Sequence, residues 1–109
     1  MAQKRLIVRL RPNGAVTDEF IKDWAERLKE MATETGCLQF ELFRSVRNPD
    51  SFILLEHWDS QEALEAHWAA IRAADPASAG RGPSVTRESL EYYDQRSFDF
   101  DGTTLTPRA

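Results

Sequence analysis

The sequence predicts an α+β domain of the ferredoxin-like kind, with the element order βαββαβ and a four-stranded antiparallel sheet. Residues 4–11 and 37–46 alternate apolar with polar side chains, as β-strands do, and two other stretches repeat apolar residues at the spacing of one helix face. A chain of 109 residues fits one domain. We expect residues 1–96 to form it, and residues 97–109 to form a C-terminal tail that packs on the domain or on a second subunit.

The first strand and helix are predicted by their own residues. Leu6 and Val8 belong to the alternating set of residues 4–11, and Pro12-Asn13-Gly14 supplies a turn that ends the strand. Thr17 is of the type that caps a helix, and apolar residues then recur on one face as far as Met31. We expect Gly36 to stop this helix as a left-handed cap.

The middle of the chain predicts an antiparallel hairpin. Residues 37–46 form one strand, residues 47–51 have turn chemistry around Pro49, and residues 52–58 are a nearly continuous apolar run. In that run Leu54 and Leu55 point to opposite faces, so both faces of the sheet need cover. Helices can cover one face, and a second subunit can cover the other.

A second helix follows the hairpin and carries a histidine on its apolar side. Asp59 or Ser60 is expected to cap it, with Glu62 three residues after Asp59 as in a capping box. His67 then lies on the same side as Leu64 and other aliphatic residues, facing inward. Residues 73–87 are rich in Ala, Ser, Gly and Pro and are expected to be mobile, and a last strand is expected over 90–96.

The stretch from Gly36 to Trp68 resembles the antibiotic biosynthesis monooxygenase family. The matching segments are Gly36-Cys37-Leu38, Phe40–Ser45, Glu56–Ser60 and Ala63–His67, in this order and at these spacings. The resemblance implies a dimeric α+β barrel, in which the sheets of two identical subunits pack together, with a pocket between each sheet and its helices. It also implies oxygenation of a quinol or polycyclic phenol by molecular oxygen without a cofactor, the deprotonated substrate itself giving the electron to oxygen.

His67 is the candidate catalytic residue. An imidazole ordinarily titrates at about pH 6.5, so in an apolar pocket it can take or hold a phenolic proton. Glu56, Tyr92 or Tyr93 could be its partner. The residues expected to line the pocket and bind a small aromatic substrate are Val8, Phe20, Trp24, Phe40, Leu64, Trp68, Ile71 and Tyr92.

Other readings stay open. His67 could be a core histidine bonded to backbone or water, and the protein a non-catalytic dimer that binds a small molecule, or a carbonyl isomerase of the same fold. Haem degradation is disfavoured by three departures from the haem-binding branch. The first strand lacks its Asn, the expected Trp position falls on His67 with Trp68 displaced by one, and the expected His position falls near Ala77.

Composition argues against several kinds of partner. The net charge is −4 and the basic residues are scattered, so no nucleic acid partner is expected. Cys37 is the single cysteine, and no HxH, HExxH, CxxC or GxGxxG motif occurs, so we expect neither a disulfide within the chain nor a metal or cofactor site. No secretory signal or apolar run of about 18 residues is present, which predicts a cytoplasmic protein without a membrane segment.

Overall fold

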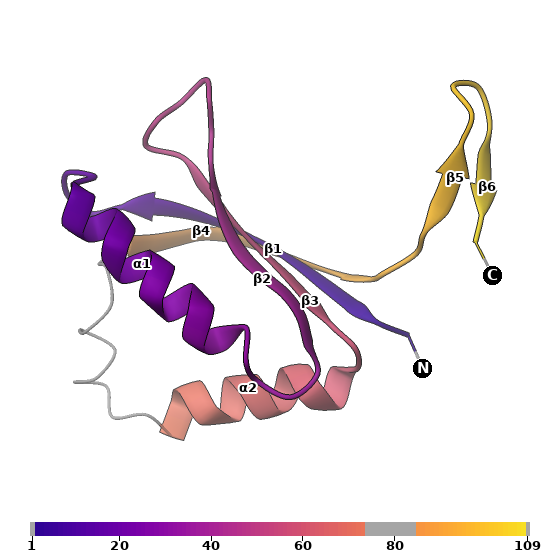
Figure 1. The fold of residues 1–109 in the computed structure, drawn as a ribbon, viewed down its shortest axis with the longest axis horizontal. Helices are drawn as coiled ribbons and strands as arrows, with labels where there is room; N and C mark the ends of the chain where they lie inside the picture. Colours follow the sequence, from indigo (N-terminus) through magenta and orange to yellow (C-terminus); the bar gives the residue numbers. More distant parts are fainter. Residues whose placement is uncertain (1, 74–84, 109) are drawn as a thin grey trace.

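A computed structural model describes residues 2–73 and 85–108 of the chain. Its main sheet is antiparallel with the strand order β2-β3-β1-β4, and both helices cover one face of it (Figure 1). The elements of this layer are β1 Lys4–Pro12, α1 Asp18–Met31, β2 Cys37–Arg44, β3 Phe52–Trp58, α2 Gln61–Ala73 and β4 Val85–Asp94. The predicted α+β, ferredoxin-like fold is confirmed.

The strand register decides which side chains meet the helices. Leu6 of β1 lies opposite Glu56 of β3 and Tyr92 of β4, and Val8 lies opposite Leu54 and Leu90. Alternate residues of these strands therefore share the helix-covered face. The buried hydrophobic core on that face consists of Leu6, Val8, Leu10, Trp24, Phe40, Phe52, Leu54, Trp58 and Leu64.

The two helices begin at side-chain caps. The Thr17 hydroxyl accepts a hydrogen bond from the Phe20 backbone N–H at 3.1 Å, which confirms the predicted cap of α1. At α2 the cap is Ser60, whose hydroxyl accepts from the Ala63 N–H at 3.1 Å. Because the helix starts at Gln61, Glu62 lies one position too early to close a capping box.

Gly36 does not cap α1, so that prediction was wrong. The helix ends at Met31 with Ala32 as a right-handed C-cap, and the N–H groups of Ala32, Thr33 and Glu34 bond the last carbonyls. Gly36 instead has a φ of +81° in the turn into β2. The turn also runs so close to α2 that a Cβ on Gly36 would lie 2.5 Å from the Ala63 Cβ.

The last strand begins earlier than predicted, at Val85 rather than Leu90, and ends at Asp94. Residues 74–84 of the segment predicted to be mobile lie outside the described residues. The tail contains a hairpin of β5 Phe98–Phe100 and β6 Leu105–Pro107, with Gly102 at a φ of +95° in its turn. This hairpin extends away from the sheet and helices (Figure 1), and its packing on a second subunit stays a prediction.

None of the helices in residues 2–73 and 85–108 has the length and hydrophobicity needed to cross a bilayer.

Candidate active site

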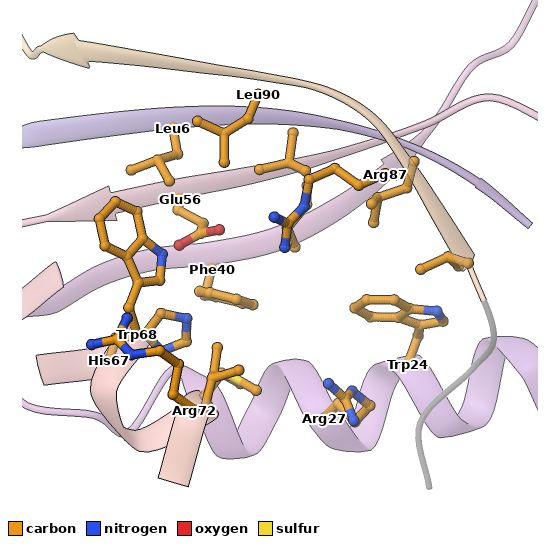
Figure 2. Close-up of a pocket in the computed structure, with 16 residues that line it drawn as sticks. Leu6, Trp24, Arg27, Phe40, Glu56, His67, Trp68, Arg72, Arg87 and Leu90 are labelled. Atoms are coloured by element: carbon orange, nitrogen blue, oxygen red, sulfur yellow. The ribbon is translucent and has the colours of Figure 1, made fainter. Parts of the chain in front are cut away.

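A cavity of about 800 Å³ lies between the sheet and the two helices (Figure 2). Most of its wall is apolar or aromatic, as is usual for small-molecule sites. The charged and titratable side chains in the wall are Arg27, Glu56, His67, Arg72 and Arg87.

The structure brings six of the nine predicted site residues to this cavity. These six are Val8, Trp24, Phe40, His67, Trp68 and Ile71. The other three are not among its lining residues. Leu64 has no exposed surface and belongs to the core, Phe20 packs against Phe52 with ring centroids 5.8 Å apart, and Tyr92 packs against Trp68 at 6.5 Å and is 39% exposed.

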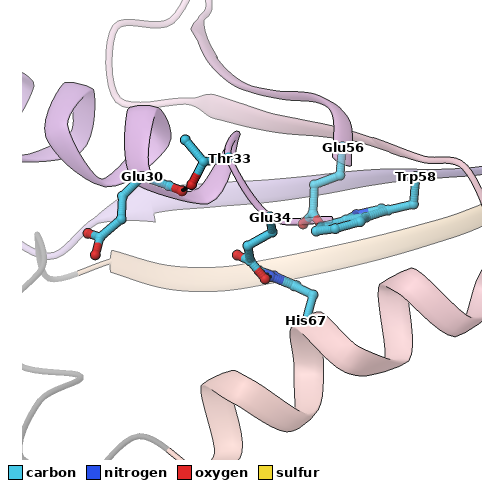
Figure 3. Close-up of polar contacts among 6 residues, drawn as sticks. All are labelled: Glu30, Thr33, Glu34, Glu56, Trp58 and His67. Atoms are coloured by element: carbon cyan, nitrogen blue, oxygen red, sulfur yellow. Dashed lines mark hydrogen bonds and ion pairs between the residues drawn. The ribbon is translucent and has the colours of Figure 1, made fainter. Parts of the chain in front are cut away.

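His67 is buried and held by a carboxylate. It projects from α2, is 3% exposed, and its Nδ1 lies 3.0 and 2.9 Å from the two carboxylate oxygens of Glu34 (Figure 3). Its ring also lies 4.8 Å from the ring of Trp58 and 5.5 Å from that of Phe40, between centroids. The imidazole is therefore fixed by one polar contact and two aromatic ones.

The Glu34 contact also decides how His67 can exchange protons. A carboxylate accepts hydrogen bonds, so the Nδ1 of His67 carries the hydrogen. In the neutral imidazole this leaves Nε2 without a proton and able to accept one. A carboxylate behind a histidine has the same orienting effect in other active sites, where it also stabilises the imidazolium.

Glu56 is a second buried titratable group on the cavity wall. Its side chain comes from β3, is 4% exposed and accepts a hydrogen bond from the Trp58 indole N–H at 2.9 Å (Figure 3). Burial raises the pKa of its carboxyl above the ordinary value, while the Trp58 hydrogen bond and the charges of His67 and Arg87 act in the opposite direction. Glu56 is thus a second group that can exchange a proton with a bound molecule.

Sequence reasoning missed Glu34 and the three arginines. Glu34 lies in the loop between α1 and β2, 33 residues before His67, and no motif or periodicity connects the two. Glu56 was named as a possible partner of His67, but its hydrogen bond goes to Trp58. The hydroxyl of Tyr93 donates to Glu91, on β4 itself.

The Nε2–H of His57 donates a 2.7 Å hydrogen bond to the side-chain oxygen of Gln3, and His57 lies on the sheet face opposite that of Glu56 and Trp58, as predicted. Across residues 2–73 and 85–108, the His, Cys, Asp and Glu side chains nowhere gather in a group of three or more that could hold a metal ion.

A sequence model described as antibiotic biosynthesis monooxygenase matches residues 5–70. Among curated proteins, the chain is similar to a heme oxygenase (mycobilin-producing) of Mycobacterium tuberculosis strain H37Rv. The two are 32% identical over 79 residues, which span 72% of this chain and 74% of that protein.

Solved structures of the same fold are also similar. SnoaB, a cofactor-independent oxygenase from Streptomyces nogalater, aligns with a TM-score of 0.67 at 20% identity, over 89% of this chain and 96% of its own. A Chloroflexus aurantiacus protein given the same family description aligns with a TM-score of 0.67 at 21% identity, over 93% of this chain and 100% of its own. At these identities the likeness concerns the fold.

Proposed function

The chain belongs to the antibiotic biosynthesis monooxygenase family, and from this premise we propose that it is a cofactor-independent monooxygenase acting on a quinol or polycyclic phenol. The single observation that carries the proposal is the buried His67, backed by the Glu34 carboxylate and lining a mostly apolar cavity. The flat aromatic walls suit a ring system, and the imidazole suits a phenolic hydroxyl.

The chain's residues supply the first step of the reaction. His67 takes the phenolic proton at Nε2, and Glu34 stabilises the imidazolium that results. The phenolate gives one electron to molecular oxygen, and the two radicals combine to form a peroxide at a ring carbon. The His67 imidazolium returns its proton to the peroxide, which then loses water together with the hydrogen of the same ring carbon and leaves a quinone. Overall one ring C–H and the O–H are broken, one oxygen atom becomes the new carbonyl, and the other leaves as water.

The apolar wall contributes by keeping water away. A phenolate in a dry site is a stronger electron donor than one solvated by water, and the radical pair is shielded from side reactions. Glu34 acts as a positioning residue, because it bonds His67 and is not among the residues that line the cavity. The aromatic contacts of Trp58 and Phe40 hold the imidazole plane.

The test is oxygen consumption with a panel of hydroquinones and anthrones. We expect the purified protein to take up oxygen and form the quinone, and His67→Ala to lower kcat by about 100-fold or more, the usual value of a general base. His57→Ala is the matched control, since it removes the other histidine from the opposite sheet face. Added imidazole should restore part of the lost rate in His67→Ala, because it replaces the missing base.

Two results would refute the proposal. One is the absence of oxygen uptake with every member of the panel. The other is a His67→Ala protein that is folded and as active as the unaltered one. Binding of an aromatic compound without oxygen uptake would instead favour a non-catalytic binding protein or, where a carbonyl compound is rearranged, an isomerase.

Haem degradation is a second candidate because the curated relative at 32% identity is a heme oxygenase. In this cavity the one imidazole is that of His67, and its Nδ1 is engaged by Glu34, so Nε2 alone is open to iron. If the substrate is a phenol, we expect titration with haem to give no saturable shift of the Soret band. A saturable shift that disappears in His67→Ala would replace the phenol by haem as the substrate.

We also propose a homodimer located in the cytoplasm. The physical support for the dimer is the outer face of the sheet, which both helices leave uncovered (Figure 1).

A further inference from the structure

The cavity has two chemically different ends. His67 and Glu56, the groups that can exchange protons, lie toward α2, while Trp24 and Arg27 project from α1 at the far end (Figure 2). A molecule lying along the cavity therefore meets a proton acceptor at one end. At the other it meets an indole N–H and a guanidinium, which only donate hydrogen bonds.

Two of the donors at the α1 end have no partner among the described residues. The indole Nε1 of Trp24 and the Nε of Arg27 are both buried, and neither has a hydrogen-bond acceptor within the part of the chain that the structure describes. Trp24 is 8% exposed, and the Arg27 guanidinium lies 5.6 Å from the centroid of its ring. A buried donor without an acceptor costs about 1–3 kcal/mol, so native proteins rarely keep one without a reason.

The charges of the cavity wall point the same way. Among the described residues, three arginines line the cavity, Arg27, Arg72 and Arg87, against the single acidic side chain of Glu56. In residues 2–73 and 85–108 none of the three forms an ion pair. A wall with this excess of positive charge favours an anion, and more so in an apolar surrounding where charges are weakly screened.

We infer that the α1 end of the cavity, at Trp24 and Arg27, binds a carboxylate carried by the aromatic substrate. A carboxylate offers two acceptor oxygens in a plane, which matches a guanidinium, and each oxygen keeps a lone pair that can accept from a further donor such as the indole N–H. This inference rests on the proposed function, and it narrows the substrate class to hydroxylated polycyclic acids. The phenolic hydroxyl lies at His67, and the acid group lies at the opposite end of the ring system.

Calorimetric binding tests this without any turnover. The probe is 6-hydroxy-2-naphthoate, with its hydroxyl and carboxylate at opposite ends, and the comparison is 6-hydroxy-2-naphthamide, which has the same shape without the charge. We expect the carboxylate to bind at least about 10-fold more tightly than the amide, in the range of a charge-assisted hydrogen bond. In Arg27→Gln that preference should fall to about 3-fold or less.

Two further variants locate the effect. Arg72→Gln, at the α2 end, should retain more of the preference than Arg27→Gln does. Arg9→Gln is the matched control, since Arg9 is on β1 outside the cavity and bonds the Ser51 hydroxyl at 3.2 Å. It should retain all of the preference. High salt should reduce the preference of the unaltered protein.

The outcomes separate this inference from the proposed function. Equal binding of acid and amide, no binding of either, or a preference that survives Arg27→Gln would overturn the carboxylate site even where neutral quinols are oxidised. A clear preference for the acid that is lost in Arg27→Gln supports the site even where no oxygen is consumed, and then the monooxygenase assignment alone fails.

Discussion

Among the single residues, Glu56 has a side-chain carboxyl whose ionised form is destabilised by burial. Its pKa is raised above its unfolded value, chiefly by desolvation. The folded state therefore binds the proton more tightly than the unfolded chain does. Its contribution to stability is complete at low pH and is lost as the pH rises through the folded pKa.

Glu56→Gln should remove this pH-dependent loss. The amide oxygen can still accept the Trp58 hydrogen bond, but the side chain carries no charge to desolvate. We expect the variant to gain about 1 kcal/mol over the unaltered protein at about pH 8, and the gain to shrink toward about pH 4. Urea unfolding across that range measures it. Glu26→Gln, on the exposed side of α1, is the control. A difference that stays constant with pH would contradict this account.

His67 and Glu34 show what sequence patterns can and cannot predict at this scale. Helical spacing placed His67 on the inward side of α2, and it is buried there, because the 3.6-residue period fixes direction from local sequence alone. Glu34 could not be predicted, because it meets His67 only after α1, the loop and α2 have packed. Trp24 was expected to line the pocket as an apolar wall, and only the structure shows that its buried N–H has no acceptor among the described residues.

Among the secondary-structure elements, the turn before β2 packs closely on the beginning of α2, and Gly36 lies at the point of contact. Its positive φ strains any residue with a Cβ, and the added atom would meet the Ala63 Cβ at 2.5 Å and the Asp59 carboxylate at 2.7 Å. We expect Gly36→Ala to lower the free energy of unfolding by about 2 kcal/mol or more, from left-handed strain of about 1–2 kcal/mol plus the clash.

Substitutions of two other glycines separate the effect of backbone strain from that of the steric clash when all three variants are unfolded in urea. Gly14 has open space and no positive φ, so Gly14→Ala should change stability by less than about 0.5 kcal/mol. Gly102 has a φ of +95° and open space, so Gly102→Ala adds strain without a clash, and only in the C-terminal hairpin. If Gly36→Ala were as mild as Gly14→Ala, the close packing of this turn on α2 would be refuted.

Elements that are marked by turn or cap residues in their own sequence were predicted well. The start of β4, which depends on pairing with β1, was not. The hairpin of β2 and β3 has turn residues between two apolar stretches, and Thr17 marks the start of α1. The first residues of β4 read as part of a loop, yet Val85 pairs with Pro12 and Thr86 with Arg11. Pairing with β1 extends the strand past what its composition favours.

At the scale of the whole molecule, the sheet has one face that the helices leave uncovered. Both helices lie on the face of Leu54 and Glu56, so the opposite face, which carries Ile53 and Leu55, faces outward (Figure 1). Phe43 and Tyr93, both nearly half exposed, belong to the same outer face by register. An antiparallel sheet that faced only water would alternate toward polar residues there.

We therefore expect the protein to be a dimer at about 10 µM in sedimentation experiments, with two outer sheet faces in contact. Leu55→Lys places a charge at the centre of that face and should shift the protein toward monomer while the cavity on the other face still binds ligand. Val46→Lys is the matched control, because Val46 is fully exposed in the turn after β2.

Removing residues 97–109 should also weaken the dimer, since Phe100 and Leu105 are 65% and 64% exposed. A monomeric unaltered protein, or a dimer indifferent to Leu55→Lys, would show that this face is not the interface.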